Sequence, residues 1–269
     1  MVSNKDKNIG YELPDNTSLV FAKGVIKGNR TYAEEKLRMK DKFKISSGFS
    51  WMRANIIDDS VYNAIDESKN KEIELGKDYD FAKAGSSWKY LKFYAYDNDG
   101  DKVLIIIKPG SFKTNQAFLN NNGQLNQDYM KKLSELNESS FDIISENSKH
   151  CKQLTLFDKV ISDDVNSQHE QKQEQEQEQE QEQEISHFYI LLYELDGNHE
   201  VKDLKLVMPS PDGREIYQIQ DLRSYIKGEK LSEDQRKAVS EETENTELAQ
   251  SYEYYMSDDD IDNDIDNEH

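Results

Sequence analysis

A run of alternating glutamine and glutamate, EQKQEQEQEQEQEQE from Glu170 to Glu184, constrains the fold of this chain more than any other feature. A stretch without apolar side chains cannot enter a hydrophobic core, so it predicts a solvated segment between folded parts. A strand would place the glutamates from Glu174 onward on one face, and a helix would repeat them at i,i+4, so both forms bring like charges together. We expect a frayed helix or an extended coil.

The acidity of the chain is concentrated in two segments. The formal net charge is −20. The Gln-Glu run contributes seven acids against one base, and the stretch from Gly228 to His269 contributes fifteen acids against three bases. The remaining body is therefore close to neutral. This distribution argues against DNA mimicry, because mimicry needs carboxylates fixed at phosphate-like spacing.

The cysteine, histidine and apolar content bears on location and bound groups. Cys151 is the single cysteine, which excludes an internal disulfide framework and a zinc site built on cysteines. The five histidines are scattered, so neither a metal site nor a cofactor is expected. The start, MVSNKDKNIG, has no apolar signal region, and no apolar run approaches the roughly 18 residues of a membrane span. We expect a soluble, cytoplasmic protein.

The N-terminal part predicts one strand followed by two helices. The segment from Ser18 to Ile26 mixes apolar and small residues and is followed by Gly28-Asn29, a pair typical of turns. The stretch from Thr31 to Phe43 begins with a capping-box pattern and predicts a helix. The stretch from Trp51 to Glu67 predicts an amphipathic helix whose apolar face carries Ile57, Val61, Ala64 and Ile65.

The rest of the body predicts two hairpins and short helices. The first hairpin runs from about Ser86 to Lys108 through the turn DNDG, and the second runs from His187 to Gly213. The run VLIII in the first hairpin is apolar on both faces, which is typical of a central strand. Short helices are expected at Asp128 to Leu136 and at Gln220 to Ile226.

This order of elements favours an α+β fold, in which the two hairpins share one mixed, largely antiparallel sheet with a few packed helices. We expect residues 1–17 to be a flexible N-terminus and residues 18–227 to be a single domain. A low-complexity insert at 165–185 interrupts that domain, or else separates two smaller ones. Residues 228–269 are expected to be a disordered acidic tail with a transient helix near Glu233 to Val239.

The turn of the first hairpin carries part of a calcium-loop pattern. Asp97, Asp99 and Gly100 match a portion of the EF-hand motif D-x-D-x-D-G. The first ligand position of that motif would be Ala95, and the twelfth, which needs a glutamate, would be Ile106. We therefore interpret the segment as a hairpin turn, since Asp, Asn and Gly tolerate turn dihedral angles.

A divergent metal-dependent nuclease is the enzymatic alternative. Asp203 and Lys205 share one face of an expected strand, as the acid and lysine of PD-(D/E)XK nucleases do, and Glu194 or Asp196 would add a metal-binding oxygen. The same residues also fit an amphipathic strand with its charges toward water. The sequence contains no nucleophile-elbow or P-loop pattern, so an ordinary metabolic enzyme is disfavoured.

The span from Ala22 to Arg53 is basic, with nine bases against three acids. Lys36, Arg38 and Lys40 are close enough in sequence to add their electric fields, so the span from Lys23 onward is a candidate for binding nucleic acid. A solvated helix surface would have the same composition.

The segment GFSWMRAN is a candidate recognition surface. Phe49, Trp51, Arg53 and Asn55 combine large apolar surface with directed hydrogen bonding, and Trp88 in the first hairpin adds an aromatic side chain. In the alternative interpretation, the aromatic residues belong to the core and Arg53 is a structural partner at its rim.

Three short motifs invite comparison with known families. The chain carries F-x-W-x-R-x-N from Phe49 to Asn55, G-x-x-W from Gly85 to Trp88, and a late strand that ends in Gln220-Asp221-Leu222. Together these motifs resemble an uncharacterised domain family of Gram-positive bacteria and their phages and plasmids. The resemblance spans residues 21–226 and implies an origin in a mobile element and no known chemistry.

We expect a non-enzymatic, cytoplasmic interaction protein, encoded by a phage or plasmid, that binds and modulates a host or defence protein. The hypothesis rests on the α+β body, the lack of an assembled catalytic motif and the acidic appendages, which suit the regulation of contacts. The alternative is the nuclease, or a nucleic-acid-binding protein that uses the span from Lys23 to Arg53. No membrane partner is expected.

Overall fold

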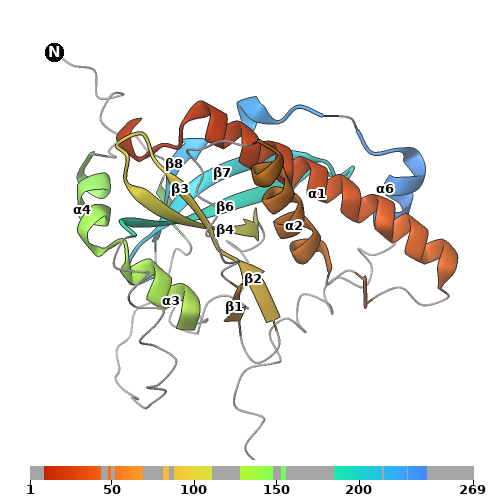
Figure 1. The fold of residues 1–269 in the computed structure, drawn as a ribbon, viewed down its shortest axis with the longest axis horizontal. Helices are drawn as coiled ribbons and strands as arrows, with labels where there is room; N and C mark the ends of the chain where they lie inside the picture. Colours follow the sequence, from red (N-terminus) through yellow and green to blue (C-terminus); the bar gives the residue numbers. More distant parts are fainter. Residues whose placement is uncertain are drawn as a thin grey trace, which may run out of the picture.

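A computed structural model of the chain shows a six-stranded sheet with helices on both of its faces (Figure 1). No helix of the described part is long and apolar enough to cross a membrane. The structure describes residues 9–43, 48–49, 52–68, 81–84, 88–110, 128–147, 153–155, 185–213, 215–228 and 230–240.

Two long helices near the N-terminus, α1 and α2, pack together. A short 3-10 helix precedes them, and the other described helices follow later in the chain. The expected helix from Trp51 is confirmed as α2, and the short helix from Asp128 is confirmed as α3. The helix α4 was not expected. The helical elements are η2 (Ile9–Tyr11), α1 (Asp15–Lys42), α2 (Met52–Ser68), α3 (Asp128–Glu135), α4 (Glu138–Asn147), η6 (Arg223–Tyr225) and α6 (Glu233–Ser240).

The helices α1 and α2 approach each other closely at two glycines. A Cβ atom at Gly24 would lie 2.5 Å from the Cα atom of Val61, and one at Gly28 would lie 2.7 Å from the Cα atom of Ile57. These separations are far below van der Waals contact. Because glycine has no side chain, the two helix backbones can meet at these positions.

The expected strand from Ser18 to Ile26 is wrong, because this stretch forms the first half of α1. Its buried residues Phe21 and Val25 are four positions apart, which is the spacing of one helix face. Gly28-Asn29 is part of the same helix instead of a turn. Thr31 accordingly lies inside the helix, and α1 begins after Pro14.

The sheet is mixed and largely antiparallel, and its strands follow the order β3-β4-β6-β7-β8-β5. The strands β4 and β6 run parallel, whereas the other neighbouring pairs are antiparallel. The α+β fold and the second hairpin are thus confirmed, whereas the first hairpin is confirmed only for β3 and β4. The strands are β1 (Phe81–Ala84), β2 (Trp88–Leu91), β3 (Phe93–Tyr96), β4 (Lys102–Pro109), β5 (Gln153–Thr155), β6 (His187–Leu195), β7 (Val201–Pro209) and β8 (Glu215–Asp221).

The first hairpin differs from the expected one in its outer strand. The long strand expected before the turn is broken at Lys92 into β2 and β3. The strand β3 pairs with β4, while β2 pairs with β1 in a separate two-stranded ribbon. The parallel neighbours β4 and β6 need a crossover, and the chain between them contains α3, α4 and β5.

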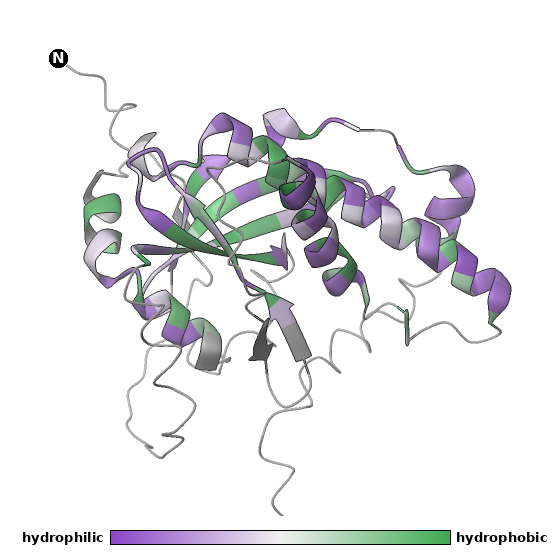
Figure 2. Ribbon diagram, viewed as in Figure 1, coloured by the Kyte–Doolittle hydropathy of each residue, from purple (hydrophilic) through white to green (hydrophobic). Residues whose placement is uncertain are grey.

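Apolar side chains cover both faces of the sheet. The central strands of the ribbon in Figure 2 accordingly have mostly hydrophobic colours. The helices α1 and α2 cover one face, where Phe21 and Val61 join a core with Ile105. The helix α3 covers the other face, where Met130 joins a core with Ile106. The strand β4 is therefore buried from both sides, as the VLIII run predicts.

A buried asparagine fixes the corner between α3 and α4. The Asn137 side chain donates to the carbonyl oxygens of Phe188 at 3.0 Å and Pro209 at 2.9 Å, and it accepts from the Phe188 N–H at 2.7 Å. These three bonds attach the start of α4 to β6 and β7. They place α4 beside the first residues of β6.

The folded part begins earlier and ends later than the expected boundaries. In the N-terminus, Leu13 is buried, and its N–H and C=O bond to the side chain of Gln220. In the expected tail, Leu231 and Val239 pack with Tyr32 of α1, and they hold α6 against that helix. The Gln-Glu run and residues 241–269 lie outside the described residues.

Candidate metal centre

Asp97, Asp101 and His187 meet at the end of the sheet where β3 turns into β4 and where β6 begins. Each side chain offers one ligand atom, and these three atoms lie within 4.8 Å of one another. The parallel pairing of β4 and β6 sets Val103 opposite His187. This register brings the first residue of β6 beside the turn that precedes β4.

The side chain of Asp97 organises that turn. Its Oδ1 atom accepts hydrogen bonds from the N–H groups of Asp99 at 3.1 Å and Asp101 at 2.9 Å. Gly100 has a φ of 86°, in the left-handed region that favours glycine. Asp97 is 3% exposed, and its Oδ2 atom has no hydrogen-bond partner among the described residues. One oxygen thus builds the turn, and the other remains available to the site.

The imidazole of His187 is oriented from α4. Its Nδ1 atom is hydrogen-bonded to the Ser140 hydroxyl at 2.7 Å. Its Nε2 atom lies 3.5 Å from Asp101 Oδ2 and 3.9 Å from Asp97 Oδ2. His187 is 6% exposed, and Nε2 has no hydrogen-bond partner in the described part of the chain. Metal-binding histidines commonly have this arrangement, with the second nitrogen held by a polar group.

Burial shifts the pKa values of both buried groups toward their neutral forms. It raises the pKa of Asp97 to about 6, against the opposing effect of the backbone hydrogen bond from Asp101. Burial also lowers the pKa of His187, although the Asp101 carboxylate counteracts this shift. A neutral imidazole is the form that binds metal ions.

One nitrogen and two carboxylate oxygens suit a transition-metal ion. Zn²⁺, Mn²⁺, Fe²⁺ and Co²⁺ accept mixed nitrogen and oxygen ligands, whereas Ca²⁺ and Mg²⁺ prefer oxygen alone. Bonds of about 2.1 Å place tetrahedral ligand atoms roughly 3.4 Å apart. The observed separations of 3.5 and 3.9 Å from His187 Nε2, and of up to 4.8 Å between the two carboxylate oxygens, therefore need inward movements of the side chains. The side chain of Asp101 is 52% exposed, so the site is open to solvent on that side.

Sequence reasoning missed this cluster. It predicted the turn around Asp97 but did not single out Asp101 or His187 as ligands. The turn and the histidine are far apart in sequence, so no local spacing reveals them. Recognising the site requires the parallel pairing of β4 with β6. The signal that the sequence does contain is an acid-rich turn, together with a much later strand whose first residue is a histidine.

The two acidic residues of the nuclease hypothesis are neighbours in the sheet, but each already pairs with a lysine or arginine side chain. Glu194 of β6 is the register partner of Asp203 on β7. Lys205 forms an ion pair with Asp203, and Arg223 Nε lies 3.8 Å from Asp203 Oδ1. Lys202 lies 3.7 Å from Glu194. Within the described residues, Glu194 and Asp203 do not join a third metal-ligating group.

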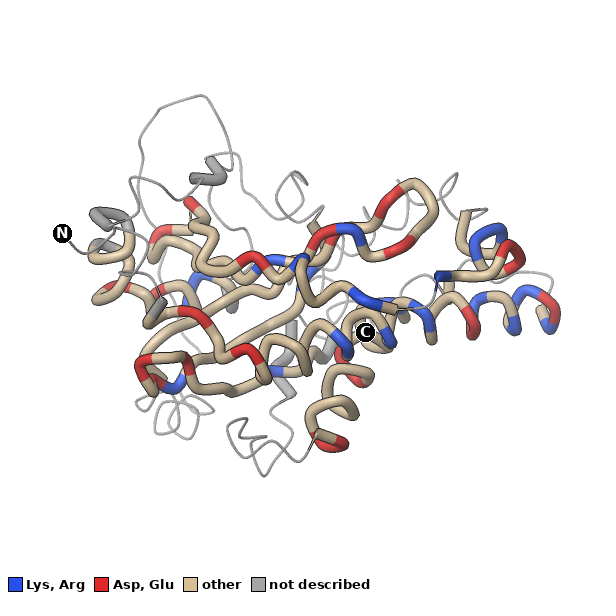
Figure 3. The backbone as a smooth tube through the Cα atoms, turned by 90° about the horizontal axis from the view of Figure 1, so that it is seen from above, with Lys and Arg blue, Asp and Glu red and all other residues tan. Residues whose placement is uncertain are grey.

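The basic span forms a mixed-charge surface on α1. Lys36 is buried, Lys40 is partly exposed, and the exposed Arg38 forms an ion pair with Glu35 one turn earlier. Acidic positions are interspersed among the basic ones along the end of α1 that extends beyond the sheet (Figure 3). Neighbouring acids reduce the local positive potential that a phosphate backbone needs.

Part of the predicted recognition segment packs around a buried tyrosine. The Phe49 ring stacks on Tyr32 with a centroid distance of 5.8 Å and an angle of 14° between the ring planes. The guanidinium carbon of Arg53 lies 4.3 Å from the centroid of the same ring. Phe49 and Arg53 thus contact the domain's own core, as in the structural interpretation of this segment.

The other predicted recognition residues lie on separate elements or outside the described part. Trp51 lies outside the described residues. Asn55 is exposed on α2. Trp88 begins β2, where its backbone pairs with Ala84. Asn55 and Trp88 therefore belong to a helix and to the small ribbon.

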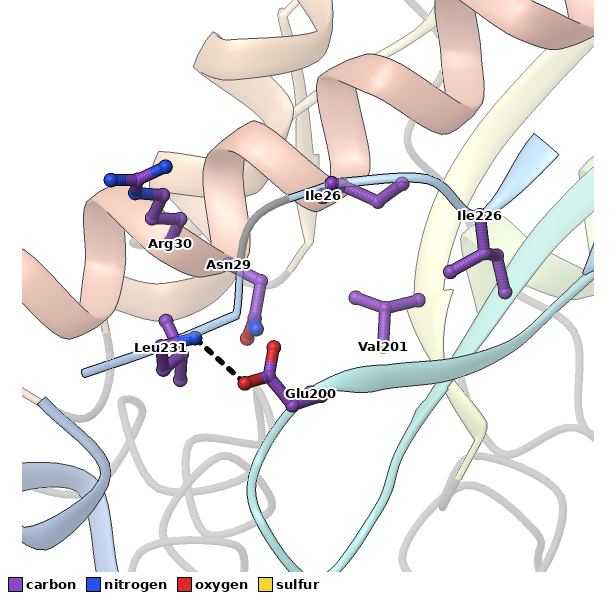
Figure 4. Close-up of a pocket in the computed structure, with 8 residues that line it drawn as sticks. Ile26, Asn29, Arg30, Glu200, Val201, Ile226 and Leu231 are labelled. Carbon is purple, nitrogen blue, oxygen red and sulfur yellow. Dashed lines mark hydrogen bonds between the residues drawn. The ribbon is translucent and has the colours of Figure 1, made fainter. Parts of the chain in front are cut away.

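A small pocket lies beneath the segment that connects η6 to α6 (Figure 4). The N–H of Leu231 donates to Glu200 Oε1 at 2.7 Å, and the Asn29 side chain donates to the carbonyl of His199 at 2.9 Å. These bonds join the segment, α1 and the turn before β7. The pocket is a packing seam between them, lined by Ile26, Asn29, Arg30, Glu200, Val201, Ile226, Gly228 and Leu231.

Comparisons with protein-family models, curated proteins and solved structures found no match to this chain. The interpretation of the site therefore depends on its own geometry. The resemblance to a family of Gram-positive bacteria and their mobile elements stays a prediction.

Proposed function

We propose that this protein binds a divalent transition-metal ion through Asp97, Asp101 and His187. The observation that carries the proposal is a pair of buried atoms, Asp97 Oδ2 and His187 Nε2, which lie 3.9 Å apart without hydrogen-bond partners in the described residues. Buried polar atoms are nearly always satisfied in folded proteins. A cation bound between these atoms satisfies both, and Asp101 supplies a further oxygen.

The charge of the site supports the proposal. Asp97, Asp99 and Asp101 place three carboxylates within one short turn, and a divalent ion offsets their repulsion. The Ser140 hydroxyl already fixes the imidazole, so little rearrangement is needed to bind an ion. The exposed side of Asp101 leaves room for water on the ion and for exchange with solution.

Cobalt titration tests the proposal directly. We expect Co²⁺ to produce visible absorption bands that saturate at one ion per chain and that added Zn²⁺ abolishes. Asp97→Asn and His187→Asn are each expected to weaken binding by roughly tenfold or more, because each removes a ligand. Ca²⁺ and Mg²⁺ should not displace cobalt at equal concentration.

Asp196→Asn is the matched control. Asp196 builds the turn of the other hairpin in the same way, since its Oδ1 accepts from the N–H groups of Asn198 and Glu200. Within the described residues it is not part of a metal-ligating cluster. Its substitution should leave cobalt binding unchanged. A native chain that shows no cobalt bands and retains no zinc after dialysis would overturn the proposal.

Protein binding is a second candidate function, favoured by the end of α1. This end extends beyond the sheet with α6 alongside it (Figure 1). Phe43, just past the helix, is 50% exposed, and exposed large apolar side chains are common in contact surfaces. A protein that binds the native chain through this end of α1 should no longer bind Phe43→Asp, and the melting temperature of the variant should equal that of the native chain. If the variant still binds any such partner, this surface is not the contact site.

A further inference from the structure

We infer that the ion at this centre fastens the N-terminal segment, Ile9 to Leu13, onto the domain, so that metal loading controls the docking of the N-terminus. The inference rests on the proposed metal binding. It assigns a consequence to the ion, because the segment contacts the same turn that carries Asp97 and Asp101.

Two backbone hydrogen bonds join the segment to the turn. The N–H of Asn98 donates to the carbonyl of Glu12 at 2.9 Å, and the N–H of Asp99 donates to the carbonyl of Gly10 at 3.1 Å. Both donors lie between the two acidic ligands in sequence. The two N–H groups point toward the segment because the turn is closed. The hydrogen bonds to the Asp97 side chain hold the turn in this closed form.

The contact is close enough to be sensitive to small movements of the turn. A Cβ atom at Gly10 would lie 2.0 Å from Asp99 Oδ2, so the carboxylate rests against the glycine backbone. The Tyr11 ring lies 5.3 Å from the His187 ring, and the carbonyl of Tyr11 accepts from the Tyr189 hydroxyl at 3.2 Å. The segment therefore contacts the turn and the histidine together.

Charge repulsion among the carboxylates predicts that ion binding promotes, and does not oppose, docking of the segment. The carboxylates of Asp97, Asp99 and Asp101 repel one another at neutral pH, and this repulsion favours an open turn. A bound cation offsets the repulsion and stabilises the closed turn, in which the N–H groups of residues 98 and 99 bond to the segment.

A second anchor lies away from the metal ligands. Gln220 of β8 accepts from the N–H of Leu13 and donates to its carbonyl, both at 3.1 Å. Coupling between two sites is reciprocal in free energy. If the ion promotes docking of the segment, then a change that loosens docking at Gln220 must weaken ion binding, although this side chain is not a ligand.

Hydrogen exchange of the full chain, with and without Zn²⁺, tests the inference, and bound zinc is measured in the same samples. We expect zinc to slow exchange of the N–H groups of Leu13, Asn98 and Asp99 by roughly tenfold, a typical size for coupling between sites. The strands β7 and β8 serve as internal controls, and their exchange should change little.

Two variants test the reciprocal effect. Gln220→Ala removes the anchor, and Gly10→Ala, whose methyl group would meet the Asp99 carboxylate, pushes the segment away from the turn. Both are expected to weaken zinc binding by about the factor seen in exchange. Gln218→Ala, on the same strand, is the control and should bind zinc as the native chain does.

The outcomes separate the two proposals. Zinc that binds without slowing exchange at Leu13, Asn98 and Asp99 would overturn the fastening of the N-terminus and leave metal binding intact. Zinc that is not retained by the native chain would overturn metal binding and, with it, the fastening. Slower exchange together with weaker binding by both variants would support the inference.

Discussion

At the scale of single residues, Asp58 shows how burial sets the behaviour of an ionisable group. Asp58 lies on α2, is 8% exposed, and accepts a hydrogen bond from the Leu91 N–H at 3.2 Å. Burial raises its pKa to about 7, although this hydrogen bond and Lys108 oppose the shift. The folded state therefore binds the Asp58 proton more tightly than the unfolded state does. The resulting stability is present in acid and is lost as the pH rises through the folded pKa.

We expect Asp58→Asn to remove this pH dependence, since the amide oxygen can still accept from Leu91. Between pH 5 and pH 8 the native chain should lose about 1–3 kcal/mol of unfolding free energy relative to the variant. Urea denaturation of both proteins at the two pH values measures the difference, and other titrating groups cancel in the comparison. Parallel changes in the two proteins would show that Asp58 does not carry the shift.

At the scale of elements, the α1–α2 pair depends on the absence of two side chains. We expect Gly24→Ala to lower the unfolding free energy by about 1–3 kcal/mol, because the new methyl group meets the backbone of Val61. The loss should appear even though alanine favours a helix by about 1 kcal/mol over glycine. Thermal unfolding measures it. Gly197→Ala, where a Cβ atom meets nothing within 4 Å, is the control and should be close to neutral.

The same pair shows what sequence patterns can and cannot predict. The helix α2 and both hairpins could be predicted because their apolar spacing and turn residues agree with one another. The first half of α1 could not be predicted, because glycines such as Gly24 and Gly28 are typical of turns. In the fold, both glycines are instead the points where α1 contacts α2. That role depends on the residues of α2 that they meet. The site at His187 was missed for a similar reason, because it depends on which strands become neighbours.

At the scale of the whole molecule, six described strands share one sheet, and the Gln-Glu run and residues 241–269 lie outside the described residues. We expect deletion of Gln171 to Gln183 to leave the melting temperature unchanged within error, because this run carries no apolar side chain that could pack. The strands on either side of the insert still have their partners in the sheet. Differential scanning calorimetry compares the two chains, and a large fall in the deletion variant would show that the run is structural.

The proposed metal ion lies at the junction of β3, β4, β6 and α4. The most direct measurement is an anomalous difference map, recorded above and below the zinc absorption edge from crystals of the native chain grown with Zn²⁺. We expect a peak about 2.0–2.2 Å from His187 Nε2 and from carboxylate oxygens of Asp97 and Asp101. Crystals of His187→Asn should lack this peak. A native map with no density between these three side chains, or with zinc bound at Glu194 and Asp203 instead, would contradict the account.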